Sequence, residues 1–332
     1  MVVVEIAELD VADDRSLREF FDVDEASQRA DQPYVVLRTF PQLVQMSRRP
    51  SPFYRRTLLV ARDGERMVGT ADLGLTVEDN LHLADLEVRV LPDVRRQGIG
   101  RLLHDELVRR ARAAGRTTLL GALNQPLAGE SPAYRFATAL GYEVVHEQDH
   151  HVLRLPVAEE TLDDVDQTPA GYEIVTWQNR APEDLVAAYA AMHTQMGQDV
   201  PTGEVDHQPI EVTVERVREG ERRTTEAYDT LVAVARRVAD GVLGGYTVVH
   251  LAHGTDYVVQ DDTLVMPDHR GHGLGMALKV ANLRILAAEH PERRVVHTWN
   301  AVENTFMQGI NSRLGYRTVN RELEVQRRIA DA

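Results

Sequence analysis

Cysteine is absent from the 332-residue chain. Disulfides, thiolate metal sites and covalent catalysis through a cysteine are therefore excluded. Lysine is almost as scarce, because Lys279 is the only one and arginine carries nearly all the positive charge. Metal-ligand spacings such as H-E-x-x-H are missing as well, so the sequence predicts no metal site.

Long hydrophobic runs are also missing. No window approaches the roughly 18 consecutive apolar residues of a membrane-spanning helix. The opening Met1-Val2-Val3-Val4-Glu5 lacks the basic region and the apolar core of a signal peptide. We therefore expect a cytoplasmic protein with no membrane partner.

Positive charge is in short supply overall, and the formal net charge is −15. This balance argues against nonspecific nucleic-acid binding, which needs a basic surface to displace counterions. It would suit a small cationic substrate, although acidity also serves solubility alone. The hydrophobic content of 43% is that of an ordinary globular protein, and the length predicts two domains.

One short pattern occurs twice. The run V-L-P-D-V-R-R-Q-G-I-G at residues 90–100 returns as V-M-P-D-H-R-G-H-G-L-G at residues 265–275. Each copy follows an apolar, strand-like run and precedes a helical pattern, which predicts a strand, a glycine turn and a helix N-terminus. Backbone N–H groups at the positive end of a helix bind anions. Each copy is therefore a candidate site for a phosphate-bearing ligand.

The duplication extends to the surrounding pattern and sets the domain boundaries. A hairpin signal precedes each glycine turn, and a final strand closes each half near residues 151–157 and 322–327. Between them, residues 158–170 are acidic, contain Pro169 and show no apolar period. We predict domains at 1–157 and 171–332, joined by a linker at 158–170.

Two nucleotide-binding motifs fail at these turns. Neither copy has the Gly-Lys-Ser/Thr ending of a P-loop, and the G-x-G-x-x-G fingerprint fails at Leu103 and Met276. The pattern that fits is R-x-x-G-x-G, at residues 95–100 and 270–275. With this motif the sequence resembles the GNAT superfamily of acetyl-coenzyme A-dependent N-acetyltransferases, in the tandem two-domain form found in actinobacteria. The downstream run 300–307, Asn311 and the Leu-Gly-Tyr at 314–316 strengthen the resemblance, and residues 140–142 repeat that ending.

The resemblance implies a fold and a cofactor. It implies two α/β GNAT-type domains, each with a mixed, splayed β-sheet flanked by α-helices, whose fourth and fifth strands part to admit the pantetheine arm of acetyl-CoA. The implied cofactor-binding residues in the first half are Val90, Arg95, Arg96, Gln97, Gly98, Ile99, Gly100 and Arg101. Those in the second half are Val265, Arg270, Gly271, His272, Gly273, Leu274, Gly275, Met276, Asn300 and Asn304.

Carboxylates before the turns are candidate catalytic bases. An alkylamine has a pKa of about 10.4 and must lose a proton before it can attack. The GNAT pattern places a carboxylate on the strand before the glycine turn, where this chain has Glu87 in one half and Asp261-Asp262 in the other. Neighbouring residues on a strand face opposite ways. We favour Asp262, which lies as far from its arginine as Glu87 does.

The general acid of the family is missing. GNAT enzymes often carry a tyrosine four residues before the final glycine, where this chain has Ala137 and Asn311. Asn311 is a candidate to hydrogen-bond the sulfur or the pantetheine. A thiolate with a pKa of about 8.5 can also leave without a dedicated acid.

These features lead to two functional hypotheses. The first is an acetyl-CoA-dependent N-acetyltransferase that acts on a small amine-bearing acceptor by direct transfer, with the second domain catalytic. The second hypothesis is a non-catalytic acyl-CoA-binding protein, which the missing tyrosines favour. For either function we expect a monomer or a homodimer.

Overall fold

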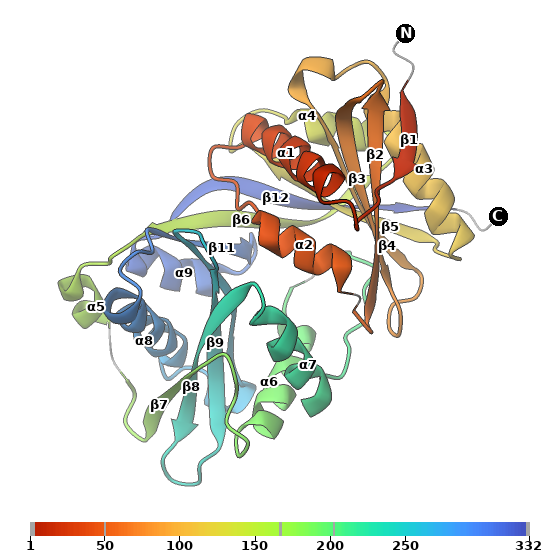
Figure 1. Cartoon of the computed structure of the whole chain (residues 1–332). Helices are drawn as coiled ribbons and strands as arrows, with labels where there is room; N and C mark the ends of the chain where they lie inside the picture. Colours follow the sequence, from red (N-terminus) through yellow and green to blue (C-terminus); the bar gives the residue numbers. More distant parts are fainter. Residues whose placement is uncertain (1–3, 50, 166–167, 202, 330–332) are drawn as a thin grey trace. The chain divides into compact units, whose positions relative to one another are not determined.

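The computed structural model describes residues 4–49, 51–165, 168–201 and 203–329 (Figure 1). The chain forms two compact units, here called unit 1 and unit 2. Unit 1 comprises Met1–Glu147, Thr202–Gln208 and Arg321–Ala332, and unit 2 comprises Gln148–Pro201 and Pro209–Asn320. These units differ from the expected division at 1–157 and 171–332, because each unit contains a strand from the other half.

Unit 1 is a mixed sheet with helices packed on it. Its strand order is β1-β2-β3-β4-β5-β12, antiparallel throughout except for the parallel pair β4 and β5. Its strands are β1 (Glu5–Glu8), β2 (Tyr54–Asp63), β3 (Arg66–Thr76), β4 (Leu83–Val90), β5 (Thr118–Gln125) and the part of β12 (Arg317–Arg328) from Arg321 onward. Its helices are α1 (Asp14–Asp31), α2 (Phe40–Arg48), α3 (Ile99–Ala113) and α4 (Pro132–Ala139).

Unit 2 repeats this architecture. Its strand order is β7-β8-β9-β10-β11-β6, again antiparallel except for the parallel pair β10 and β11. Its strands are β7 (Tyr172–Gln178), β8 (Tyr228–Arg237), β9 (Leu243–Ala252), β10 (Tyr257–Val265), β11 (Val295–Ala301) and the part of β6 (Glu143–Arg154) from Gln148 onward. Its helices are α5 (Glu159–Val165), α6 (Val186–Asp199), α7 (Val214–Thr224), α8 (Leu274–Glu289) and α9 (Thr305–Leu314).

The last strand of each half is exchanged. Strand β12, from the C-terminal half, pairs with β5 over residues 321–328, and β6, from the N-terminal half, pairs with β11 over residues 148–154. Part of the expected linker is also structured, because α5 packs against α8 and α9. Residues 166 and 167 of that linker lie outside the described residues.

Both sheets open at the same place, as the resemblance implied. Strand β4 pairs with β5 only over residues 83–85, and β10 pairs with β11 only over residues 257–259. The carboxyl-terminal halves of these parallel strands then part from each other. The mixed, splayed sheet flanked by helices is confirmed in each unit.

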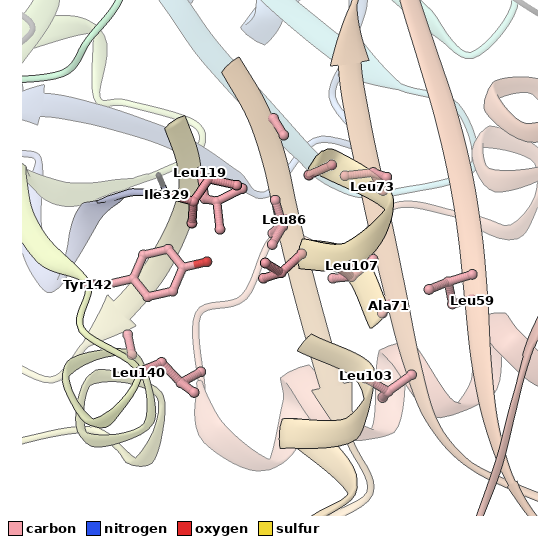
Figure 2. Packing of buried hydrophobic residues seen from close by; sticks show 14 of the residues in the cluster. Leu59, Ala71, Leu73, Leu86, Leu103, Leu107, Leu119, Leu140, Tyr142 and Ile329 are labelled. Carbon is pink, nitrogen blue, oxygen red and sulfur yellow. The ribbon is translucent and has the colours of Figure 1, made fainter. Parts of the chain in front are cut away.

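Each unit has its own hydrophobic core. In unit 1, Leu103 and Leu107 of α3 pack on Leu59 and Leu73 of the sheet, and Ile329, beyond β12, closes the same cluster (Figure 2). In unit 2 a corresponding cluster joins α8 and α9 to the sheet. Among the helices of the described residues, none is long and apolar enough to cross a membrane.

Candidate functional site

The two glycine turns have the geometry of anion sites. Gly98 and Gly273 are the N-caps of α3 and α8, and their φ angles of +91° and +78° are in the left-handed region that favours glycine. Neither helix has a side-chain cap, so its first N–H groups have no capping partner. Gln97, Gly98, His272 and Gly273 are exposed. Each turn therefore presents uncapped backbone donors to an incoming ligand.

The helical glycines behind these turns serve packing. A Cβ on Gly100 would lie 3.4 Å from Phe136 of α4, and one on Gly275 would lie 3.3 Å from Ile310 of α9. The side chains of Ile99 and Leu274 point into the core. The N–H of Met276 donates to the carbonyl oxygen of Gly273 at 3.1 Å and is already engaged. The available donors are therefore those of the turn and the very start of the helix.

The motif arginines hold the strand ends in place. Nε of Arg95 donates to the carbonyl oxygen of Val90 at 3.0 Å, and Nε of Arg270 donates to that of Val265 at 3.1 Å. Their guanidinium groups also bind Asp31 of α1 and Asp199 of α6, respectively. These arginines connect the end of β4 to α1 and the end of β10 to α6. Arg96 and Arg101 are the exposed arginines of the first turn.

A β-bulge in β10 affects the placement of Asp261 and Asp262. Gln260 pairs with Val249 and Thr263 pairs with Thr247, so Asp261 and Asp262 together lie opposite Val248. The equivalent stretch of β4 is regular, and Glu87 pairs directly with Asp72. The expectation that the two aspartates alternate as on a flat strand therefore does not apply. Their side chains nevertheless separate: Asp261 meets His250 at 3.1 Å, and Asp262 meets Tyr246.

Asp262 is half-buried among polar side chains. Its Oδ2 accepts a 2.8 Å hydrogen bond from the hydroxyl of Tyr246, and Nδ1 of His193 lies 3.8 Å away. Burial, and then the charge of Asp261, raise the pKa of Asp262 to about 6. Burial lowers the pKa of His193 to about 4, so this ring is neutral at pH 7. Sequence reasoning missed Tyr246 and His193, because no motif links β9 and α6 to the strand before the turn.

Glu87 has different surroundings. Its Oε2 lies 3.4 Å from Arg89 and 3.5 Å from Arg38. Burial alone would raise the pKa of Glu87, but the positive charges of Arg89, Arg38 and Arg56 outweigh burial and lower it. Glu87 therefore remains an ionised partner of arginines and is a weaker base than Asp262.

A groove of about 580 Å³ lies on unit 2 between α6 and residues 209–214. Ala187, Ala191 and Gln198 line it on the helix side, and Pro209 and Val212 line it on the other. Asp262, Tyr246 and His193 are not among its lining residues. The groove therefore does not include the side chains around Asp262.

The comparisons with known proteins agree with this geometry. Residues 54–144 match the family model of the acetyltransferase (GNAT) domain. A tandem GNAT protein from the clavulanic acid biosynthesis pathway, solved without acetyl-CoA, is 28% identical and has a TM-score of 0.87. The similarity covers 99% of this chain and 100% of that one.

The chain therefore contains a GNAT acetyltransferase domain and is similar over its whole length to a tandem GNAT protein. A GCN5-related N-acetyltransferase from Sphaerobacter thermophilus shares the fold at 18% identity and a TM-score of 0.68, over 98% of this chain and 95% of that one. The glucosamine N-acetyltransferase region of a fungal multi-domain β-N-acetylglucosaminidase shares it at 15% identity and a TM-score of 0.65, over 98% and 38% respectively. The curated proteins give no match.

In unit 2 the position at which GNAT enzymes often carry a tyrosine lies in the core. Asn311 is only 1% exposed, its Oδ1 accepts from Nζ of Lys279 at 2.8 Å, and its Nδ2 donates to Oδ1 of Asn300 at 2.6 Å. Asn304 is the N-cap of α9 and accepts from the N–H of Met307 at 3.1 Å. Lys279 is a further residue that sequence reasoning did not select, although its being the only lysine was a signal.

The residues present fit acyl-coenzyme A. Uncapped N–H groups at glycine turns suit a pyrophosphate, and the openings beyond residues 85 and 259 expose strand edges for an extended arm. The described residues contain no cluster of three His, Cys, Asp or Glu residues that could hold a metal ion.

Proposed function

We propose that the protein transfers an acetyl group directly from acetyl-CoA to a small amine-bearing acceptor, in the cytoplasm, and that unit 2 performs the reaction. The observation that carries this proposal is the half-buried Asp262, which lies on the part of β10 that no longer pairs with β11. When bound, acetyl-CoA supplies a thioester carbonyl that an amine can attack. The similarity to a tandem GNAT protein of a small-molecule pathway supports the choice of a small acceptor.

Asp262 is proposed as the general base. A protonated amine has a pKa near 10.4, so its deprotonation at pH 7 costs about 4–5 kcal/mol. A carboxylate with a pKa of about 6 takes this proton more readily than an ordinary aspartate. The hydroxyl of Tyr246 holds one oxygen of Asp262, which fixes the direction of the carboxylate.

Unit 1 is proposed to bind coenzyme A without turnover. Its glycine turn has the same uncapped geometry and carries the exposed Arg96 and Arg101, which suit phosphate groups. Its carboxylate Glu87 is paired with Arg38 and Arg89 and is a poor base. If unit 2 proved equally inactive, the same features would support the second hypothesis, a non-catalytic acyl-CoA-binding protein.

Calorimetric titration with acetyl-CoA tests both sites. Substitution of Gly98 or Gly273 would strain the backbone, because both have positive φ. We instead choose Gln97→Glu and His272→Glu, which add negative charge at exposed turn positions, with Gln97→Ala and His272→Ala as controls. We expect two sites in the wild type, each weakened at least tenfold by its own glutamate variant, since each charge lies beside a phosphate position.

The outcomes separate the hypotheses. Binding at both turns with acetyl transfer that Asp262→Asn abolishes supports the acetyltransferase. Binding at both turns with no transfer to a panel of amines supports the binding protein. A folded protein that binds no acetyl-CoA would overturn both.

A further inference from the structure

The only lysine of the chain is buried in unit 2. Lys279 lies on α8 and is 2% exposed, and no carboxylate contacts its ammonium group within the part of the chain that the structure describes. Nζ donates to Oδ1 of Asn311 at 2.8 Å and lies 5.6 Å from the ring centroid of Tyr316. A buried ammonium without a carboxylate is destabilising, and a methionine of similar shape would pack without that cost. A residue retained at such a cost points to a role in function.

The hydrogen bond from Lys279 determines how the side-chain amides of Asn311 and Asn300 are oriented. An ammonium group can only donate, so the oxygen of the Asn311 amide must face Lys279. The nitrogen of that amide then faces Asn300, whose oxygen accepts at 2.6 Å. The remaining group of Asn300 is its Nδ2, for which the described residues provide no acceptor. The lysine therefore determines which end of Asn300 is presented.

Asn300 lies where the sheet is open. It follows His297, the last residue of β11 that pairs with β10, and its side chain is half-buried. Unit 1 has no such chain of groups: the counterpart of Lys279 is His104, which meets Tyr142 at 3.1 Å, and Ala137 replaces Asn311. Among the described residues, the arrangement is thus present only in the unit that contains Asp262.

We propose that Lys279 is a positioning residue that, through Asn311, aims the Nδ2–H donor of Asn300 at the thioester sulfur in the opening between β10 and β11. This inference rests on the proposed function. As the bond between acetyl carbon and sulfur breaks, its electron pair stays on sulfur, and the Asn300 donor stabilises the thiolate with a hydrogen bond. No proton leaves the asparagines, and the thiolate takes its proton from solvent.

The protonation state of Lys279 controls whether the side-chain amide of Asn311 is held in one orientation. Burial lowers the pKa of Lys279 to about 7, and the other titratable groups around it are Tyr316 and His151 of β6. Above that pH the neutral amine can also accept, so the amide of Asn311 is no longer held in one orientation. The presented donor is therefore fixed best at and below neutral pH.

A single lysine makes the test direct. Full-length protein labelled with ¹⁵N,¹³C-lysine gives one side-chain NMR signal, which can be followed against pH with CoA and with desulfo-CoA, which lacks the sulfur. We expect CoA, but not desulfo-CoA, to shift this signal and raise the pKa of Lys279. Asn300→Ala should remove the difference, while Ser312→Ala, at an exposed position of α9, should retain it.

Kinetics provide a second readout. Lys279→Met should lower kcat about tenfold with little change in the KM for acetyl-CoA, since loss of a direct donor costs about 10²–10³. Lys279→Gln keeps a donor without a titrating group, so it should restore most of the rate. In the wild type, kcat should decline above neutral pH as Lys279 loses its proton. Lys279→Gln should not show this decline.

Three results would count against this inference. If CoA and desulfo-CoA bind and change the lysine signal equally, or not at all, the inference is wrong and the proposed function stands. The inference is also wrong, and the proposed function again stands, if Lys279→Met and Lys279→Gln have wild-type kcat and pH profiles. If neither nucleotide binds in calorimetry, the proposed function fails, and the inference fails with it.

Discussion

Asp262 and Glu87 hold the same sequence position before their glycine turns, yet their neighbours make them chemically different. Glu87 lies within 3.5 Å of two arginines, which lower its pKa. Asp262 has a tyrosine hydroxyl and a neutral histidine beside it, and burial raises its pKa. The difference between the two units therefore resides in individual side chains around a shared backbone pattern.

The raised pKa of Asp262 predicts how the rate depends on pH. As pH rises through about 6, Asp262 becomes ionised and able to accept a proton, so kcat/KM for the acceptor should rise there. Asp262→Asn should lower kcat/KM at least 100-fold and abolish this limb of the pH profile. An unchanged limb in the variant would show that another group is the base.

The same shift predicts an effect on stability with the opposite trend. The folded state holds the Asp262 proton more tightly than the unfolded state, so the free energy of unfolding decreases as pH rises from about 4 through about 6. Asp262→Asn should therefore stabilise the protein by about 1–2 kcal/mol at pH 8 and by nearly nothing at pH 4. Urea denaturation at the two pH values measures this difference.

Lys279 predicts a stability change at higher pH. Its folded-state pKa lies near 7 and its ordinary value is 10.5, so the unfolded state binds its proton more tightly. The free energy of unfolding should therefore rise between pH 7 and pH 10. Lys279→Met should stabilise unit 2 by about 2–4 kcal/mol at pH 7, and the gain should shrink toward pH 10. An equal gain at both values would mean that the folded and unfolded states bind the lysine proton equally over this range, so that the pKa of Lys279 is not lowered.

At the scale of elements, strand β10 differs from β4 by one inserted residue. The bulge places Asp261 and Asp262 opposite Val248, whereas β4 keeps a regular ladder with β3. An extra residue in one strand bends it and redirects the side chains around the bulge. The orientation of Asp262 toward Tyr246 therefore depends on the local length of the strand as well as on residue identity.

Deleting Asp261 tests the role of the bulge. The deletion should restore a regular ladder and break the hydrogen bond between Tyr246 and Asp262, since a one-residue shift moves a side chain to the other face. We expect a folded protein by circular dichroism with transfer reduced at least 100-fold. Asp261→Ala is the control, because it keeps the bulge and should retain acetyl transfer. It should also move the rise of kcat/KM to lower pH, since the charge of Asp261 helps to raise the pKa of Asp262.

At the scale of the whole molecule, the exchanged strands make each unit depend on both halves of the chain. Strand β5 has its outer partner in residues 321–328, and β11 has its partner in residues 148–154. Pairing of this kind completes a sheet edge that would otherwise be open. Neither half of the sequence, expressed alone, contains a complete unit.

Truncation after Asn320 should therefore damage unit 1 selectively. It removes the partner of β5 and the buried Ile329, while Trp177 and Trp299 both lie in unit 2. We expect lower stability by circular dichroism, with tryptophan fluorescence still reporting a folded unit 2. A protein lacking only residues 330–332 keeps all of β12 and is the control. Equal loss of both signals would contradict two separable units.

The sequence by itself determined the repeated strand, glycine turn and helix, because these depend on local geometry: glycine for positive φ, apolar periodicity and helix ends. It also identified Asp262, Glu87 and Asn311 as residues to examine. It did not reveal which carboxylate is paired with arginine, that Asn311 faces Lys279, or that the final strands are exchanged. Lys279 and Asn311 are 32 positions apart, and the paired residues of β5 and β12 are 196 to 210 positions apart. Only the tertiary structure decided these contacts, because burial, charge pairing and strand partners arise from packing of distant segments that local sequence pattern does not encode.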